Sequence, residues 1–214
     1  ELIEINKGDS LLLRVMAYNT LANGLQDDDR IDNFTRIISA INPQIIAFNE
    51  TGGTSESDVY DLLQISVGGF WDVLKHPNDN ITASRFPIIA NWVVNNKIDA
   101  TLINLNEGIY DSDILIIVGH LSCCSSDIQR QQQVDGLIRF ILDAKSPGGE
   151  ISLPEYTPIV FLGDMNLVGD SQQYYTIIEG DIQNTDIYGE GGFPDWDDSE
   201  LADIICRQTD KRMA

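Results

Sequence analysis

The sequence has few basic residues: 13 Lys and Arg stand against 34 Asp and Glu, which gives the 214-residue chain a formal net charge of -21. Proteins that bind bulk nucleic acid tightly use Lys and Arg to neutralise backbone phosphates. The charge therefore disfavours high-affinity, nonspecific binding to DNA or RNA, although a local cationic site could still accept short nucleic acids. It also disfavours an anionic membrane surface as a partner.

Long apolar runs are missing as well. The longest, Ile114–Val118, has the length of a strand and is far too short to cross a bilayer. We therefore expect no transmembrane segment. No signal peptide is recognisable at Glu1, and the acidic, lysine-poor composition favours an extracellular or periplasmic setting.

Only three cysteines are present, so they cannot all pair with one another. Cys123 and Cys124 are adjacent, and a disulfide between neighbouring residues would be strained. A bridge from either one to Cys206 is the alternative, and a thiol nucleophile helped by His120 stays formally open. Cysteine usage alone leaves the redox compartment undecided.

Several common site motifs are absent. The chain has no G-x-x-x-x-G-K phosphate loop, no G-x-S-x-G elbow and no C-x-x-C pair. A calcium-binding loop that began at Asp164 would need oxygen ligands at the positions of Val168 and Tyr175, so the sequence does not match an EF-hand-type calcium loop there.

Buried strands alternate with amphipathic helices along the chain. Apolar residues recur at helical spacing from Ile31 to Ile41, where Pro43 ends the pattern; Ser57 and Asp58 are candidate caps of a second helix, and a third begins near Ser126. This alternation predicts a layered α/β domain, and no linker divides residues 1–214 into two domains. The strand-like runs are Leu11–Tyr18, Gln44–Phe48, Ile88–Val94, Ala100–Leu105, Ile114–Gly119 and Pro158–Gly163.

The last third of the chain is strongly acidic. No Lys or Arg occurs from Ser146 to Cys206. A solvated acidic face explains this, and a structural divalent cation is the alternative, because clustered carboxylates are hard-cation ligands. The candidate ligands for that cation are Asp195, Asp197, Asp198 and Glu200.

Polar residues stand at the ends of four strand-like runs, where a sheet can hold them rigidly. Each has a structural alternative: Asn19 or Asp164 could form turns, Glu50 could begin a helix, and His120 could be a core histidine. Four successive cases nevertheless predict one polar, metal-capable edge of the sheet. The residues are Asn19, Glu50, His120, and Asp164 with Asn166.

Five motifs in order resemble the endonuclease/exonuclease/phosphatase superfamily, which includes pancreatic-type deoxyribonuclease, abasic-site endonucleases and bacterial sphingomyelinases. The likeness covers residues 11 to about 212, and Leu201-Ala202-Asp203 resembles a late segment of the family. The motifs are Tyr18-Asn19-Thr20-Leu21, Pro43-Gln44-Ile45-Ile46-Ala47-Phe48-Asn49-Glu50, Ser84-Arg85-Phe86-Pro87-Ile88, Gly119-His120-Leu121 and Gly163-Asp164-Met165-Asn166.

The resemblance implies a four-layer αββα sandwich with two mixed sheets, and phosphodiester hydrolysis assisted by Mg²⁺ or Mn²⁺. In this interpretation Glu50 is the principal metal ligand with Asn19 beside it, and Asp164 positions or deprotonates the attacking water. His120 and Asn166 contact the phosphoryl group, and Asn19 binds the metal or the phosphate. Arg85 either orients a carboxylate, touches phosphate, or packs as a structural residue near Pro87.

One departure from the family is clear. Its members end in an Asp-His pair, and this sequence contains no Asp-His dipeptide; its other histidine, His76, is far from the end. We therefore expect the natural polypeptide to continue past Ala214 with further strands and that pair. The expected protein is a monomer acting on a small phosphodiester, a nucleotide or a lipid headgroup, with nuclease action and an inactive binding module as alternatives.

Overall fold

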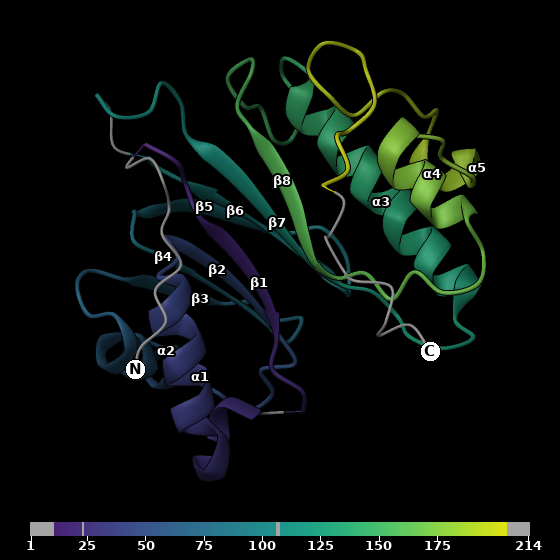
Figure 1. Cartoon of the computed structure of the whole chain (residues 1–214). Helices are drawn as coiled ribbons and strands as arrows, with labels where there is room; N and C mark the ends of the chain where they lie inside the picture. Colours follow the sequence, from purple (N-terminus) through teal and green to yellow (C-terminus); the bar gives the residue numbers. More distant parts are fainter. Residues whose placement is uncertain (1–10, 23, 106–107, 205–214) are drawn as a thin grey trace.

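The structure, a computed structural model, describes residues 11–22, 24–105 and 108–204. Two four-stranded sheets stack face to face, and helices cover the outer face of each (Figure 1). Both sheets contain parallel and antiparallel pairs. The predicted four-layer αββα sandwich with two mixed sheets is confirmed.

The first sheet has the strand order β1-β2-β4-β3. Strand β1 runs parallel to β2, whereas β4 runs antiparallel to both of its neighbours. The strands are β1 (Val15–Asn19), β2 (Ile45–Asn49), β3 (Asp72–Lys75) and β4 (Asn80–Ser84). Helices α1 (Asp28–Ile41) and α2 (Glu56–Ser66), together with a short 3-10 turn at Gly24–Gln26, cover its outer face (Figure 1).

The second sheet has the order β5-β6-β7-β8, and only β7 and β8 pair in parallel. The strands are β5 (Ile88–Val93), β6 (Ile98–Ile103), β7 (Ile114–His120) and β8 (Ile159–Asp164). Helix α3 (Asp127–Lys145) packs on its outer face, with α4 (Gln172–Glu179) and α5 (Thr185–Tyr188) beside it (Figure 1).

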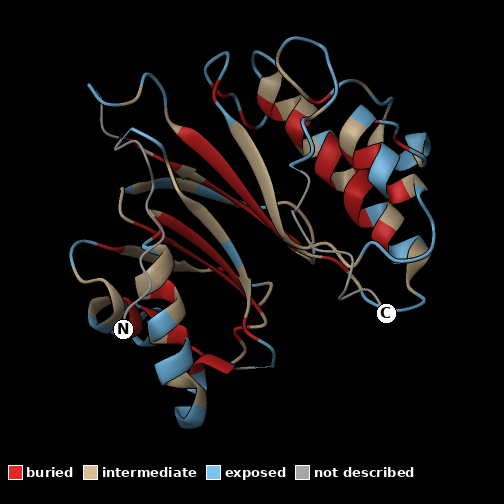
Figure 2. Ribbon diagram, viewed as in Figure 1, coloured by how far each residue is buried: buried red, intermediate tan, exposed pale blue. Residues whose placement is uncertain are grey.

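Three apolar clusters hold the four layers together. One lies between α1, α2 and the first sheet, and one lies between α3 and the second sheet. The third joins the two sheets through the inward side chains of β2, β6 and β7, such as Ile45, Ile103 and Ile116. Strand β7 is buried almost throughout, whereas the edge strands β1 and β8 are mostly half-buried (Figure 2).

The interface between the sheets also contains polar groups. His76 is buried, and its Nε2 atom lies 3.0 Å from Thr82 Oγ1 and 3.3 Å from Thr101 Oγ1. Burial lowers the pKa of His76 to about 4. His76 is therefore a neutral structural residue at physiological pH.

Some local predictions needed correction. Helix α2 is capped by Ser55 rather than by Ser57 or Asp58: Ser55 and Asp58 form a reciprocal capping box, with Asp58 at the third helical position. The prediction that Pro43 ends the first helix is confirmed, with Asn42 as its left-handed cap. Strands β3 and β4 and helices α4 and α5 were not predicted.

No helix among the described residues is long and apolar enough to span a membrane.

Candidate metal centre

Four strands deliver polar side chains to the same end of the sandwich. Asn19 ends β1 opposite Asn49, the last residue of β2, while His120 ends β7 opposite Asp164, the last residue of β8. Glu50 follows β2 directly. Because β1 is parallel to β2 and β7 to β8, the carboxyl ends of each pair meet at one edge. The structure thus brings together the predicted residues Asn19, Glu50, His120 and Asp164.

The side-chain amide of Asn19 joins the two carboxylates of the cluster. Its Nδ2 atom donates to Glu50 Oε1 at 2.8 Å and to Asp164 Oδ2 at 2.9 Å. Its Oδ1 atom accepts the backbone N–H of Leu21 at 2.9 Å. Asn19 therefore fixes the spacing between a residue of the first sheet and a residue of the second.

Glu50 is held as a carboxylate anion. The hydrogen bonds from Asn19 and from the backbone N–H of Ala22, which reaches Oε2 at 2.7 Å, lower its pKa, with a smaller contribution from His120 and Lys97. Glu50 also has a left-handed backbone with φ of 57°. Such strain in a residue other than glycine is typical of functional sites.

The cluster fits a divalent cation. Glu50, His120 and Asp164 each offer a ligand atom, and these atoms lie within 4.8 Å of one another; among the described residues no other group of three His, Cys, Asp or Glu is as close. His120 Nε2 lies 3.6 Å from Glu50 Oε1, and all three side chains are half-buried. One ionised glutamate with few other protein oxygens is what Mg²⁺ prefers, because it keeps several of its waters.

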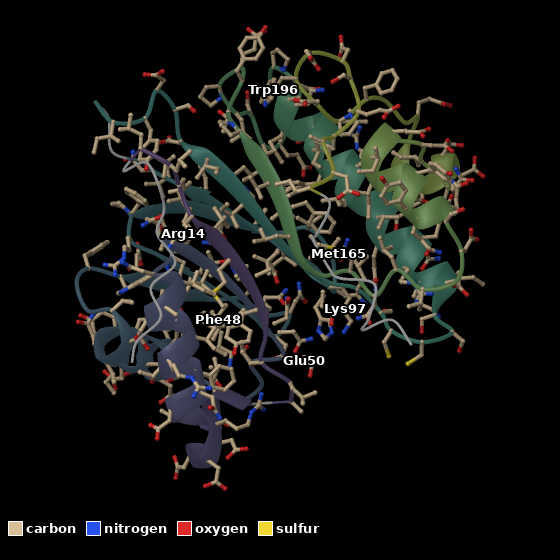
Figure 3. The ribbon with its side chains drawn as sticks, viewed as in Figure 1. Arg14, Phe48, Glu50, Lys97, Met165 and Trp196 are labelled. Atoms are coloured by element: carbon tan, nitrogen blue, oxygen red, sulfur yellow. The ribbon has the colours of Figure 1, made fainter. Side chains whose placement is uncertain are left out.

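Lys97 is a cationic neighbour that the sequence analysis missed. It lies in the turn between β5 and β6, close to Glu50 at the same end of the sandwich (Figure 3). Its backbone carbonyl accepts the N–H of His120 at 3.0 Å. A sequence signal existed, because Lys97 is the only Lys or Arg between Arg85 and Arg130 and stands shortly before a strand-like apolar run.

Asn166 lies just beyond Asp164 on the same loop. Its backbone N–H donates to Asp164 Oδ1 at 3.2 Å, and its Nδ2 donates to the carbonyl of Leu121 at 2.9 Å. The residue has a left-handed φ of 45°. These contacts join the loop after β8 to the loop after β7, so that Asn166, Asp164 and His120 are held together.

Asn49 supports the centre from below, and sequence reasoning did not identify it. It is fully buried, and its Oδ1 accepts the backbone N–H of Asp164 at 3.1 Å. Its Nδ2 donates to Asn80 Oδ1 at 2.8 Å and to the Gly119 carbonyl at 3.2 Å. One amide thus bonds to β4, β7 and β8, and it locks the two sheets in register beneath the candidate ligands.

The same buried network continues to Asp99 on β6. Its two carboxylate oxygens accept Asn80 Nδ2 at 2.8 Å and Asn78 Nδ2 at 2.9 Å, and the residue has no exposed surface. Burial raises the pKa of Asp99 to about 6 from its ordinary 3.8, although the two amide donors oppose the shift.

The shift at Asp99 makes stability depend on pH. Between about pH 4 and 6 the Asp99 carboxyl group is protonated in the folded protein but ionised in the unfolded chain. The stabilisation of the folded state that comes from this protonation is therefore complete below pH 3.8 and is lost as the pH rises through about 6. His76 acts in the opposite direction, because burial lowers its pKa. Asp99→Asn removes this falling contribution but keeps the opposing ones from His76 and from Glu50, whose pKa is also lowered in the folded protein, so the free energy of unfolding of the variant should rise more steeply with pH than that of the wild type. We expect a difference of up to about 3 kcal/mol across this window, measured by urea denaturation at each pH.

The matched control for this experiment is Asp61→Asn, which removes an exposed carboxylate from α2. Its pH profile should run parallel to that of the wild type. If Asp99→Asn also ran parallel, the buried carboxyl group would titrate as it does in the unfolded chain.

Two predicted features do not join the centre. Arg85 follows Ser84, which pairs with Ile45 at the opposite end of β2 from Asn49. Its guanidinium group lies over the Trp71 ring at 4.6 Å and donates to the Gly68 carbonyl at 3.1 Å. These contacts match the structural alternative for Arg85.

The acidic cluster near the end of the described chain does not converge on a cation site. Asp195 accepts a hydrogen bond from the backbone N–H of Trp196, and Asp197 accepts one from Ser199 Oγ. The cluster consists of Asp195, Asp197, Asp198 and Glu200.

One family profile matches most of this chain. The sequence profile described as "Endonuclease/Exonuclease/phosphatase family" matches residues 16–200. No curated protein sequence matches the chain.

Solved structures with the same fold share little sequence with this chain. The human nocturnin catalytic domain with bound sulfate anion is 16% identical with a TM-score of 0.57, and the match covers 82% of this chain and 71% of that one. ANGEL2, a 2′,3′-cyclic phosphatase in complex with adenosine-2′,3′-vanadate, is 17% identical with a TM-score of 0.54, covering 78% and 57%. TDP2 from C. elegans is 18% identical with a TM-score of 0.51, covering 78% and 52%. At these identities the likeness establishes the fold.

Proposed function

Because the chain belongs to the endonuclease/exonuclease/phosphatase family, a family of hydrolases, we propose that it is a divalent-metal-dependent hydrolase that cleaves phosphodiester bonds. The observation that carries the proposal is the convergence of Glu50, His120 and Asp164, with ligand atoms within 4.8 Å, around the bridging amide of Asn19. A fold alone does not require this constellation.

Glu50 and Asn19 would hold the cation, either Mg²⁺ or Mn²⁺. When bound, such an ion supplies positive charge that stabilises the phosphate oxygens and the leaving group. The lowered pKa of Glu50 supports this role, because the side chain is an anion over the whole physiological range. The carboxylate oxygens of Glu50 and Asp164 form a hard donor set that suits these metals, whereas Asn19 directs its Nδ2 toward them and its Oδ1 toward the Leu21 N–H, so its amide would have to turn over to offer the cation an oxygen.

The remaining residues would act on water and on the phosphoryl group. Asp164 is fixed by Asn19 and by the backbone of Asn166, and it is the candidate base that positions or deprotonates the attacking water. His120 would donate a hydrogen bond or a proton to the phosphoryl group. Asn166 uses one N–H of its amide on Leu121, and the second is the donor that we assign to phosphate. Lys97 adds positive charge beside Glu50.

A small phosphodiester, a nucleotide or a lipid headgroup is the proposed substrate class. The net charge of -21 opposes long polyanions, while the local charge of Lys97 and a bound metal would attract a single phosphate group. The complex of ANGEL2 with adenosine-2′,3′-vanadate is in keeping with such a substrate, although at 17% identity that likeness extends to the fold alone.

Hydrolysis of bis(p-nitrophenyl) phosphate tests the proposal directly. We expect p-nitrophenol release that depends on added Mn²⁺ or Mg²⁺, stops with EDTA and returns when the metal is restored. Short DNA and RNA oligonucleotides, assayed in parallel, distinguish a nuclease from an enzyme for small substrates. Hydrolysis that persists unchanged in EDTA would contradict the metal-dependent proposal, and a complete lack of turnover would favour an inactive binding module.

A further inference from the structure

Two adjacent thiols lie beside the candidate centre. The loop between β7 and α3 begins directly after His120 and carries Cys123 and Cys124, both exposed and both free. Their Sγ atoms are 2.7 Å apart, and Cys124 has a left-handed φ of 63°. The hydrogen bond from Cys123 is the main cause that raises the pKa of Cys124. Neither sulfur has a role in the hydrolysis proposed above.

Arg130 clamps this loop to the loop that follows Asp164. The arginine side chain has no exposed surface although it carries a charge. Its Nη1 atom donates to the carbonyls of Ser122 at 2.7 Å and Cys124 at 3.0 Å, and its Nη2 atom donates to the carbonyl of Val168 at 3.1 Å. Asp127 forms an ion pair with the same guanidinium group. A change in the backbone at Cys124 therefore reaches the loop after β8.

Leu121 makes a second connection between the two loops. Its N–H donates to the Asp164 carbonyl at 3.0 Å, and its own carbonyl accepts Asn166 Nδ2 at 2.9 Å. The segment 121–124 is thus hydrogen-bonded both to a candidate catalytic residue and to a candidate phosphate ligand.

We propose that Cys123 and Cys124 form a reversible thiol–disulfide site, and that its oxidation by a peroxide loosens the contacts between loop 121–124 and segment 164–168. The attacking thiolate displaces hydroxide from hydrogen peroxide and becomes a sulfenic acid, and the hydroxide takes up the proton that the thiol had released and leaves as water. The second thiol then attacks that sulfur, the S–S bond forms and a second water leaves. Two thiols are oxidised and one peroxide is reduced, so electrons and atoms balance.

Geometry explains both the strain and the reversibility. Neighbouring Cα atoms are about 3.8 Å apart across a trans peptide, whereas disulfides usually join Cα atoms about 4.4–6.8 Å apart. Closing the ring must therefore rotate the backbone between Cys123 and Cys124 and shift the Cys124 carbonyl that Arg130 binds. A strained disulfide is also reduced more easily than a relaxed one. The exposed position of both thiols gives an oxidant and a reductant access.

Peptide mass identifies the bond without any assay of activity. Tryptic cleavage places Cys123 and Cys124 together in peptide 98–130 and Cys206, which lies outside the described residues, in peptide 146–207. The full chain is reduced, treated with one equivalent of hydrogen peroxide, alkylated and digested without reductant. We expect peptide 98–130 to appear unalkylated and lighter by two hydrogens, and to take up two alkyl groups after dithiothreitol. Peptides 98–130 and 146–207 joined by a disulfide, or both thiols still alkylated, would overturn the proposal.

Hydrogen exchange tests the structural consequence independently. Amides in segment 164–168 should exchange faster in the oxidised chain, and the Cys123→Ser and Cys124→Ser variants should show no change on peroxide treatment. The Cys206→Ser variant is the matched control and should respond like the wild type. Equal exchange in the oxidised and reduced chains would refute the coupling even if the disulfide forms.

An effect on catalysis rests on the proposed function. If the chain hydrolyses phosphodiesters, oxidation should lower kcat/KM roughly tenfold, because small displacements of catalytic groups have large effects on rate. Dithiothreitol should restore the rate. Unchanged kcat/KM in a fully oxidised sample would contradict this part, whereas an enzyme inactive in both states would contradict the proposed function and leave the mass and exchange results as the decisive readouts.

Discussion

Replacing Glu50 with Gln should lower kcat/KM for the metal-dependent hydrolysis of bis(p-nitrophenyl) phosphate by about 10³-fold, which corresponds to roughly 4 kcal/mol of transition-state stabilisation. The substitution keeps the shape of the side chain but removes its negative charge. It also places an N–H group where two donors, Asn19 Nδ2 and the backbone N–H of Ala22, now meet carboxylate oxygens. The affinity for Mn²⁺, measured by titration calorimetry, should fall together with the rate.

The matched control is Glu155→Gln. Glu155 is exposed and precedes β8, so it lies at the opposite end of that strand from Asp164. This variant has the same change in net charge and should keep the wild-type rate. Thermal unfolding followed by circular dichroism should show that both variants fold. A Glu50→Gln enzyme with a near wild-type rate would remove Glu50 from the metal centre.

The fold was predictable where burial controls the pattern. Six of the eight strands appear in the sequence as apolar runs. The signal is strongest for β2 and β7, because both of their faces are covered and they can carry Ile, Val and Leu throughout. Helix α1 was predictable from its apolar stripe and from Pro43. The layer order came from the family resemblance, since no periodicity reveals how two sheets stack.

Strand β4 escaped prediction for a physical reason. All five of its residues are buried, yet Asn80, Thr82 and Ser84 are polar. Asn80 and Thr82 are satisfied by partners from distant parts of the chain, including Asn49, Asp99 and Thr101. A polar interior held together by long-range hydrogen bonds has no local signature, so neither propensity nor alternation marks this segment as a strand.

The candidate site residues could be predicted from the sequence, whereas the residues that hold them in place could not. Asn19, Glu50, His120 and Asp164 stand out because each is polar and adjoins the end of an apolar strand. Asn49 and Asp99 become recognisable only when the sheets are packed, because the side-chain partners that reveal them lie 19 or more positions away along the chain. Lys97 had a sequence signal, but its position beside Glu50 is visible only in the folded protein. For Arg85 the motif left a carboxylate, a phosphate and a structural role open, and its contacts with Trp71 and a backbone carbonyl match the structural role.

The Asp164→Asn substitution should reduce kcat/KM by about 10³-fold, within the range for losing a general base. Asp164 Oδ2 accepts from Asn19 and Oδ1 from the backbone of Asn166, so an asparagine can keep one of these bonds but cannot take a proton from water. Asp111→Asn, an exposed site before β7 at the opposite end from His120, is the matched control and should keep its rate.

The Glu50→Gln/Asp164→Asn double variant carries the sharper prediction. One amide, Asn19 Nδ2, donates to both carboxylates, so each single substitution already disturbs the hydrogen bonds of the other. Residues that act as a unit have non-additive effects on rate. The double variant should therefore be no more than about tenfold slower than the slower single variant. If the two losses instead multiplied to about 10⁶-fold, Glu50 and Asp164 would act independently, and the single centre that Asn19 bridges would be the wrong description of this site.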